Sequence, residues 1–267
     1  MRIAHVIHGY PAPSMGGTGL YVHALAHALV DAGHTVAVAS PNRAGSTRLI
    51  EREHGVEHWG IETDPVRVWS DTWNGSIAPW LDWCSKWRPD VVHVHHLSGW
   101  PLSLVEQTPC RTVLTLHDYA IPCARGQLLT ERLDLCGGPD PMECTQCLGP
   151  ALRTHPALHA VGQWAARSPR LYRWARQLAS RRSGNVGAHP GVASRLEAAK
   201  RAMAAADHLL APSRDLAKRM ARLGFVEPAH TELPLLRPPQ PNPSTPTAVD
   251  SGPVRFLFAS SIIPSKG

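Results

Sequence analysis

The sequence lacks any long hydrophobic segment. Its N-terminal residues, MRIAHVIHGY, contain no extended apolar stretch of the kind found in a signal peptide. No apolar run elsewhere approaches the roughly 18 residues that a membrane-spanning helix requires. We therefore expect a cytoplasmic protein with reduced thiols, whose membrane contact, if any, is peripheral at the inner face.

Signatures of nucleic-acid binding are also missing, since the chain has no recognition-helix, RNA-binding or zinc-finger motif of that kind. Its charge is moderately basic, with 27 Lys and Arg against 21 Asp and Glu and a formal net charge of +6. An excess of this size is too small to indicate nucleic acid. It suits an anionic substrate, a phosphate-bearing ligand or an acidic membrane surface.

What the sequence does contain is a regular alternation of strand and helix patterns. IAHVIHGY reads as a strand, PAPSMGGTG as a loop, LYVHALAHALVDAG as an amphipathic helix and TVAVAS as a second strand. Further strands are expected at 66–69, 90–97, 111–119 and 208–213, and further helices at 76–87, 194–207 and 214–224. This order predicts an α/β fold with a Rossmann-like, doubly wound parallel sheet and helices on both faces.

The character of the chain changes near its end. Residues 228–253 contain eight prolines, which favour extended backbone and indicate an interdomain linker. We expect one α/β domain over residues 1–230, a linker over 231–253, and the first strand of a second domain within 254–267.

A glycine-rich loop, GGTG at residues 16–19, separates the first strand from the first helix. Glycines in this position let backbone N–H groups approach a phosphate or a sugar at the helix N-terminus, although they also suit a tight strand-to-helix turn. NAD binding is disfavoured, because Val22 replaces the third glycine of a dinucleotide motif. The second strand also ends in Ser40-Pro41-Asn42, without an acid for a ribose hydroxyl.

Histidines follow two of the predicted parallel strands. TLHDY places His117 and Asp118 at the carboxyl end of one strand, and VHVHHL places His93, His95 and His96 along the end of another. Ligands of open α/β sheets bind in the crevice outside these strand ends. A single such histidine could have only a capping or packing role, but histidines on two strands favour a polar site that includes His117.

Together these stretches resemble the GT-B glycosyltransferases of family 4. The matching stretches, in the expected order, are HVIHGYPAPSMGGTGLYVHALAHALVDAGHTVAVAS, PDVVHVHHL, TVLTLHDY, AAADHLLAPS and RFLFASSIIPSKG. Members of this family have two Rossmann-like domains, of which the N-terminal one mainly holds the acceptor and the C-terminal one the nucleotide-sugar donor. The resemblance implies retaining hexosyl transfer from a nucleotide sugar to a glycan, a lipid-linked or a small-molecule acceptor.

The resemblance also implies roles for individual residues. His117 corresponds to the catalytic histidine near the donor sugar. The residues that correspond to donor or acceptor contacts are Gly16, Gly17 and Lys266, and the glycine-rich loop and the strand ends add Thr18, His95 and Asp118 as candidates. Lys266 matches the lysine that contacts the donor diphosphate, but Ser260 and Ser261 replace the Gly-Arg pair that often precedes it, so this loop would neutralise less charge.

By the same resemblance, the chain ends just inside the donor-binding domain. The family's donor-side carboxylates would then lie beyond Gly267, so the whole protein would be an enzyme while residues 1–267 alone would transfer no sugar. The alternative is a non-catalytic, zinc-stabilised module that binds a glycan or a protein partner.

A cysteine-rich insert follows the HD motif. Its cysteines, spaced C-x12-C-x7-C-x2-C, are Cys123, Cys136, Cys144 and Cys147. The closing C-x2-C pair and the two further cysteines suit tetrahedral thiolate coordination of zinc; unligated thiols, disulfides and an iron–sulfur cluster are the alternatives. Four cysteines leave no open coordination position, so the zinc would be structural.

A basic segment, WAARSPRLYRWARQLASRR at 164–182, interleaves aromatic residues with arginines. It suits contact with an anionic acceptor, a lipid-linked sugar or the membrane surface. A solvated basic helix packed by its aromatic residues is the simpler interpretation.

Overall fold

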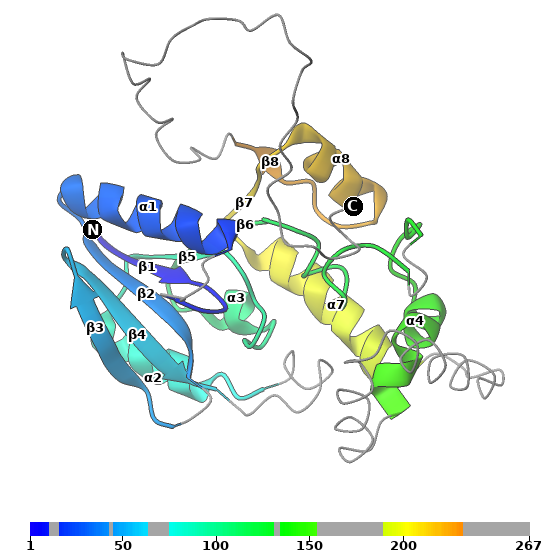
Figure 1. Ribbon diagram of the computed structural model, residues 1–267, viewed down its shortest axis with the longest axis horizontal. Helices are drawn as coiled ribbons and strands as arrows, with labels where there is room; N and C mark the ends of the chain where they lie inside the picture. Colours follow the sequence, from blue (N-terminus) through cyan, green and yellow to red (C-terminus); the bar gives the residue numbers. More distant parts are fainter. Residues whose placement is uncertain (11–15, 43–44, 64–74, 131–133, 154–188, 232–267) are drawn as a thin grey trace, which may run out of the picture.

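The computed structural model describes residues 1–10, 16–42, 45–63, 75–130, 134–153 and 189–231 (Figure 1). The strands are β1 (Arg2–Val6), β2 (Thr35–Asn42), β3 (Arg48–Glu53), β4 (Val56–Glu62), β5 (Val91–Val94), β6 (Arg111–Thr115), β7 (His208–Ala211) and β8 (Ala229–His230). The helices are α1 (Gly17–Asp31), α2 (Ala78–Trp87), α3 (Leu104–Gln107), α4 (Pro141–Arg153), α7 (Pro190–Ala205) and α8 (Arg214–Arg222).

All eight strands form one sheet in the order β3-β4-β2-β1-β5-β6-β7-β8. Every neighbouring pair is parallel except β3 with β4. The order runs outward in both directions from the central pair of β1 and β5, which is the doubly wound arrangement predicted from the alternating pattern. The prediction of a Rossmann-like parallel sheet is therefore confirmed, with one antiparallel strand at its edge.

That edge hairpin of β3 and β4 was not predicted. Its turn is formed by His54 and Gly55, whose φ angles of 45° and 83° are both positive, as two-residue hairpin turns require. β3 carries alternating charges and is mostly exposed, so it shows no apolar periodicity. The strand expected at 66–69 lies outside the described residues.

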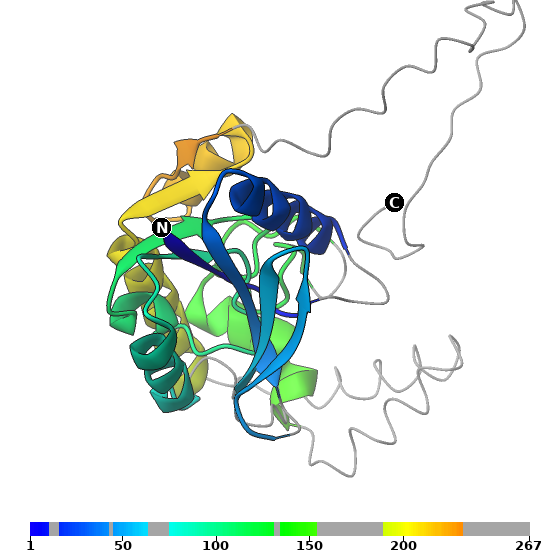
Figure 2. The same cartoon turned by 90° about the vertical axis from the view of Figure 1, so that its left-hand side faces the viewer.

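The sheet is covered on both faces, as the alternation of side chains along its strands requires. On β2, Val36 and Val38 point to the face of the sheet that α1 covers, whereas Ala37 and Ala39 belong to the larger cluster on the opposite face. Figure 2 shows α1 on one side of the sheet and α2 and α7 on the other. Each helix thus buries its apolar stripe against the parallel strands.

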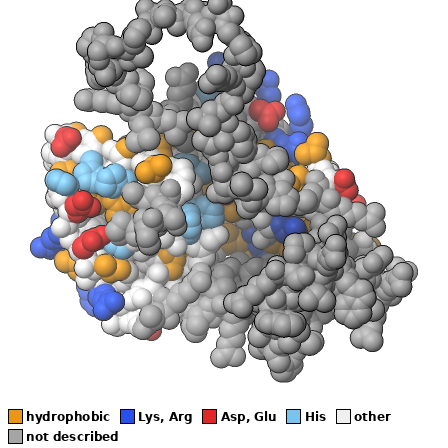
Figure 3. All heavy atoms as spheres, viewed as in Figure 1, with side chains coloured by type: hydrophobic (Ala, Val, Ile, Leu, Met, Phe, Trp, Pro, Cys, Tyr) orange, Lys and Arg blue, Asp and Glu red, His pale blue; other side chains and the backbone are white. Residues whose placement is uncertain are grey.

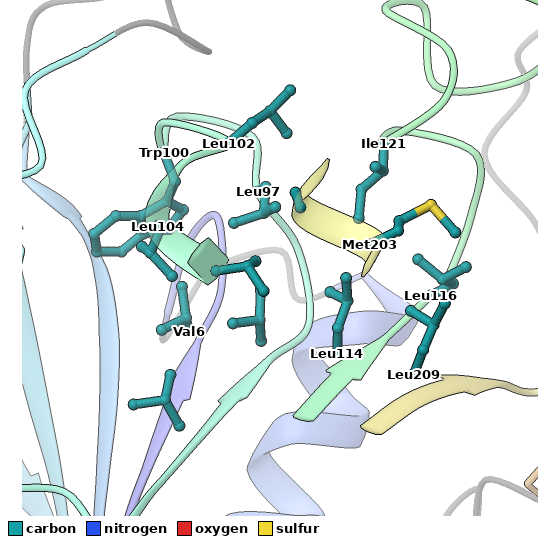
Figure 4. Packing of buried hydrophobic residues seen from close by; sticks show 14 of the residues in the cluster. Val6, Leu97, Trp100, Leu102, Leu104, Leu114, Leu116, Ile121, Met203 and Leu209 are labelled. Atoms are coloured by element: carbon teal, nitrogen blue, oxygen red, sulfur yellow. The ribbon is translucent and has the colours of Figure 1, made fainter. Parts of the chain in front are cut away.

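The larger core lies under α2, α3, α7 and α8. Trp83 of α2 stacks between two other tryptophans of that helix, Trp80 and Trp87, with both pairs of ring centroids 5.2 Å apart. Figure 4 shows apolar side chains from the strand ends and loops meeting Met203 of α7. Burial of each large apolar side chain stabilises the fold by about 1.5–3 kcal/mol, so this core fixes the strand ends that carry the site.

Helix ends follow local sequence rules. Ser213 caps α8, because its hydroxyl oxygen accepts a hydrogen bond from the backbone N–H of Leu216 at 3.1 Å. α7 begins earlier than predicted, at Pro190, a residue that favours the first turn of a helix. None of the helices among the described residues is long and apolar enough to cross a membrane.

Three predictions cannot be compared with these elements. The basic segment at 164–182 and the strand at 254–267 lie outside the described residues, and so does the linker at 231–253 apart from Thr231. The described sheet ends at β8, inside the domain that was expected over residues 1–230.

Candidate active site

The carboxyl ends of β5 and β6 lie side by side and open into a cavity. β5 and β6 pair in parallel, so the segments that follow them leave the same edge of the sheet. The cavity has a volume of about 370 Å³. Its polar lining includes His96, Asp118, Arg125, Gln127 and Arg195. This is the crevice at which an α/β sheet of this kind binds ligands.

Trp100 forms part of the wall of this cavity and is held rigidly. Its indole N–H donates to the backbone carbonyl of Ile7 at 3.0 Å, which ties the loop after β5 to the end of β1. The side chain is only 1% exposed. The cavity wall is therefore anchored to the central strands rather than to a surface loop.

A line of histidines runs from the central strand β1 to the segment that follows β6. Nδ1 of His5 lies 3.0 Å from Nε2 of His95, and Nδ1 of His95 lies 3.2 Å from Nε2 of His117. His93 is held separately, with its Nε2 2.8 Å from the hydroxyl of Thr115. Figure 3 shows histidine side chains gathered in patches on the face of the molecule that carries α1. The structure thus brings His95 and His117 together.

Burial keeps these histidines neutral. It lowers the pKa of His5 to about 4. Burial also lowers the pKa of His117 to about 4. The charge of Asp118 acts to raise this pKa, whereas His96 and His8 act to lower it. For His95, burial first and then the neighbouring histidines lower the pKa well below its usual value. At neutral pH, His117 is therefore an uncharged imidazole.

Asp118 stays ionised beside it. Its Oδ2 lies 3.2 Å from Nε2 of His96, and its Oδ1 accepts a hydrogen bond from the backbone N–H of Ala120 at 2.8 Å. Burial acts to raise the pKa of Asp118, but the hydrogen bonds and the charge of His96 outweigh it and lower the pKa. The crevice thus pairs a neutral imidazole with a carboxylate.

The glycine-rich loop meets the same site through α1. Gly16 precedes the helix and Gly17 begins it, with no side-chain cap and no acidic residue in the first turn. One turn later, the ring of Tyr21 lies 5.2 Å from that of His117 and 5.6 Å from that of His95. The N-terminus of α1 is therefore next to His117.

The local fold does not explain why glycine stands at these two positions. Neither Gly16 nor Gly17 has a positive φ, and a Cβ placed on either would meet no atom of the described residues within 4 Å. Both are exposed, and Thr18 after them is half-buried. The open space leaves room for a ligand beside the helix N-terminus, where backbone N–H groups favour negative charge.

Arg195 is a site residue that the sequence analysis did not identify. It lies on α7, is 8% exposed, and donates from Nη2 to the carbonyl of Ala120 at 2.8 Å. No carboxylate of the described residues forms an ion pair with it. Burial lowers its pKa, against the nearby thiols of Cys123 and Cys144. A charged residue on the buried stripe of an amphipathic helix was the available signal.

The four predicted zinc ligands line one small cavity of about 60 Å³. Cys144 and Cys147 lie one turn apart on α4, whose first turn is capped by the carboxylate of Asp140, which accepts from the N–H groups of Met142 and Glu143. Burial, together with the other three thiols, raises the pKa of Cys144 to about 11, against a backbone hydrogen bond with Asp140. Such mutual repulsion disfavours thiolates unless a cation joins them, so the donor set fits zinc.

A second possible metal group consists only of histidines. Within the described residues, the ligand atoms that all lie within 4.8 Å of one another belong to His5, His93 and His95, and the cysteines are not gathered so tightly. Lys266, the predicted diphosphate contact, lies outside the described residues.

In comparison with known proteins, the chain matches one family model and several solved structures. The chain matches the family model for Glycosyltransferase Family 4 over residues 15–233. No curated protein sequence matches it.

Three solved structures show a distant likeness. Sucrose-phosphate synthase from Thermosynechococcus elongatus has a TM-score of 0.48 and 15% identity, over 86% of this chain and 47% of that chain. Spinosyn forosaminyltransferase SpnP has a TM-score of 0.31 and 20% identity, over 44% and 31%. A structure from E. coli described as trehalose-6-phosphate bound with UDP-2-fluoro glucose has a TM-score of 0.30 and 13% identity, over 50% and 35%. The chain thus covers about half of the sucrose-phosphate synthase and about a third of each of the other two proteins. Because all three TM-scores are below 0.5, the assignment to a family rests on the family match alone.

Proposed function

Because the chain belongs to glycosyltransferase family 4, we propose that it forms the acceptor side of an enzyme that transfers a hexose from a nucleotide sugar with retention of anomeric configuration. The observation that carries this proposal is the cavity of about 370 Å³ at the carboxyl ends of β5 and β6, which the ionised Asp118 lines and whose neighbour along the sequence is the neutral His117. A site of this kind offers hydrogen-bonding groups to sugar hydroxyls and a wall of apolar side chains to a sugar ring.

The donor is assigned to the space between His117 and the N-terminus of α1. The uncapped N–H groups of the first turn suit a diphosphate, and Gly16 and Gly17 let it approach without a clash. Through Tyr21, this end of α1 is in contact with His117. In the whole enzyme, Lys266 would add a positive charge to the diphosphate from the second domain.

The acceptor is assigned to the cavity, and the arginines favour an acceptor with a carboxylate or a phosphate. Arg195 is buried without a carboxylate partner among the described residues, and Arg125 lines the same cavity. A buried guanidinium is costly unless an anion or several hydrogen-bond acceptors approach it. A glycan or a lipid-linked sugar that bears such a group would supply them.

A structural zinc ion would hold one wall of this cavity. Cys123 directly precedes residues 124–127, which line the large cavity, while the thiol of Cys123 faces the small one with Cys136, Cys144 and Cys147. Zinc bound by these thiolates would join the loop after β6 to α4 and fix that wall. Such a site suits a reducing cytoplasm, where we place the protein.

The second candidate is a non-catalytic glycan-binding module, which the zinc-stabilised insert alone would also allow. Catalysis separates the two. The complete product of the gene that encodes residues 1–267 is incubated with a panel of UDP-, GDP- and ADP-sugars and a glycan extract, and release of nucleoside diphosphate is measured. The enzyme proposal expects release from one donor and a product whose anomeric proton signal shows retention. Glycan binding without release from any donor would favour the binding module.

A further inference from the structure

We propose that His5 and His95 are positioning residues that hold His117 in a single neutral tautomer, with its proton on Nδ1, so that the free ring nitrogen of His117 is a hydrogen-bond donor. The inference rests on the proposed function only in one respect, namely that a sugar substrate accepts the hydrogen bond from the N–H group of His117. The hydrogen-bonded chain itself is a property of the folded protein.

The chain is built by the register of the sheet. His5 on β1 is paired with His93 on the parallel strand β5, and His95 follows the end of β5, two residues after His93. His117 follows the next strand, β6. The contacts of 3.0 Å between His5 and His95 and of 3.2 Å between His95 and His117 therefore join three strands in a row. The ring of Tyr21 packs against both His95 and His117 and limits their movement.

Neutrality makes the chain directional. His5 is fully buried and His95 is 2% exposed, and no carboxylate of the described residues contacts either ring, so nothing compensates a charge on them. A neutral imidazole has one N–H group and one bare nitrogen. His95 therefore donates through one nitrogen and accepts through the other, and the two hydrogen bonds must run in the same direction.

The far end of the chain sets that direction. Nε2 of His5 is buried and has no hydrogen-bond partner among the described residues. If it carried the proton, it would be an orphaned N–H group, which folded proteins avoid more strictly than an unsatisfied acceptor. The proton is therefore on Nδ1 of His5, which donates to Nε2 of His95. Nδ1 of His95 in turn donates to Nε2 of His117.

The consequence falls on His117. Its Nε2 is occupied as an acceptor, so its own proton is on Nδ1. A histidine in this state cannot take up a proton through Nε2, and it offers an N–H group to an oxygen of the ligand, such as a sugar hydroxyl or a leaving phosphate oxygen. No proton is transferred in this role. The group stabilises charge that develops on the oxygen, and it is aimed before the ligand binds.

The same histidines suggest one competing arrangement. One ring nitrogen of each of His5, His93 and His95 lies within 4.8 Å of the others, so a divalent metal ion could take them as ligands. If it bound through Nδ1 of His5, the proton of His5 would move to Nε2 and the hydrogen bond to His95 would be lost. The two arrangements therefore predict different protons on the same nitrogens.

The test reads the tautomers directly. The protein is labelled with ring-¹⁵N histidine, and proton–nitrogen correlation spectra are recorded at pH 7, where protonated and bare ring nitrogens of neutral histidine are well separated. Signals are assigned by single His→Gln variants. The expected spectrum has Nδ1 protonated and Nε2 bare in His5, His95 and His117. A His117 protonated on Nε2, a charged His117, or a His5 protonated on Nε2, as metal binding through Nδ1 would require, would each overturn the proposal.

A variant tests the coupling. In His5→Leu, His95 loses its donor and is free to reverse, so the Nε2-protonated form of His117 should grow. The matched control is His58→Gln, which removes a buried histidine that is hydrogen-bonded to Ser40 and is not part of the row of hydrogen-bonded histidines. This variant should leave the signals of His117 unchanged. An unchanged His117 in His5→Leu would also overturn the proposal. The wild-type spectrum decides the tautomer even if His5→Leu does not fold. Because the experiment uses no substrate, its result is independent of whether the protein transfers sugar.

Discussion

The buried histidines should make the protein sensitive to mild acid, and His5 should account for a measurable part of that sensitivity. Burial lowers the pKa of His5 from 6.5 to about 4. The unfolded chain therefore takes up a proton at His5 as the pH falls below 6.5, while the folded protein does not until about pH 4. The stability due to neutral His5 is present above pH 6.5 and is lost as the pH falls toward 4.

The size of the effect follows from the shift. Between pH 7 and pH 5, His5 alone should lower the free energy of unfolding by about 2 kcal/mol, and by about 3 kcal/mol at pH 4. His93 and His95 are also buried with lowered pKa values, so the wild type should lose more than this in total.

Urea unfolding followed by circular dichroism at pH 7, 6 and 5 would measure it. The wild type should lose about 2 kcal/mol more between pH 7 and pH 5 than His5→Leu does. His208→Gln is the control, because His208 is exposed at the amino end of β7, at the opposite end of the sheet from the crevice. It should follow the wild type. Parallel curves for the wild type and His5→Leu would show that His5 titrates alike in the folded and unfolded protein, which would refute this reasoning.

Three further predictions concern the cavities and the glycine loop. The purified protein should contain about one zinc ion per chain, and Cys144→Ser should lower both the zinc content and the melting temperature. The control Cys84→Ser should leave the zinc content unchanged. Metal-free protein after anaerobic purification would contradict the zinc site. Gly17→Ala should keep or raise stability, by at most about 1 kcal/mol, yet lower turnover by blocking the ligand. Equal turnover would mean that no ligand approaches there. Arg195→Gln should raise the KM for the acceptor by roughly tenfold or more with a smaller effect on kcat, and an unchanged KM would place the acceptor elsewhere.

The parts of the fold that could be predicted are those with strong periodicity. The βαβ unit of β1, α1 and β2 and the helix α7 show apolar residues at regular spacing, and they form as expected. The β3–β4 hairpin was missed because β3 is largely exposed and charged. α4 was missed because the cysteines of the insert were interpreted only as metal ligands, without regard to the helix that carries two of them.

The site was predictable where strand ends alone determine it. His95, His117 and Asp118 follow parallel strands, and such strands end at one edge of a sheet. The role of His5 depends on the register between β1 and β5, which no local pattern reveals. Arg195 is 75 residues from Ala120, to which it bonds, so their contact arises only from the packing of α7 on the loop after β6.

The most direct test of the central claim is the turnover of His117→Ala in the complete gene product, measured as nucleoside diphosphate release from its preferred donor. Loss of one pre-aligned hydrogen-bond donor should lower kcat by roughly 10²–10³-fold. The melting temperature should hardly change, because His117 is only half-buried at the end of β6. His208→Ala, at the opposite end of the sheet, should keep wild-type turnover. Wild-type turnover in His117→Ala would contradict the assignment of the active site to this crevice.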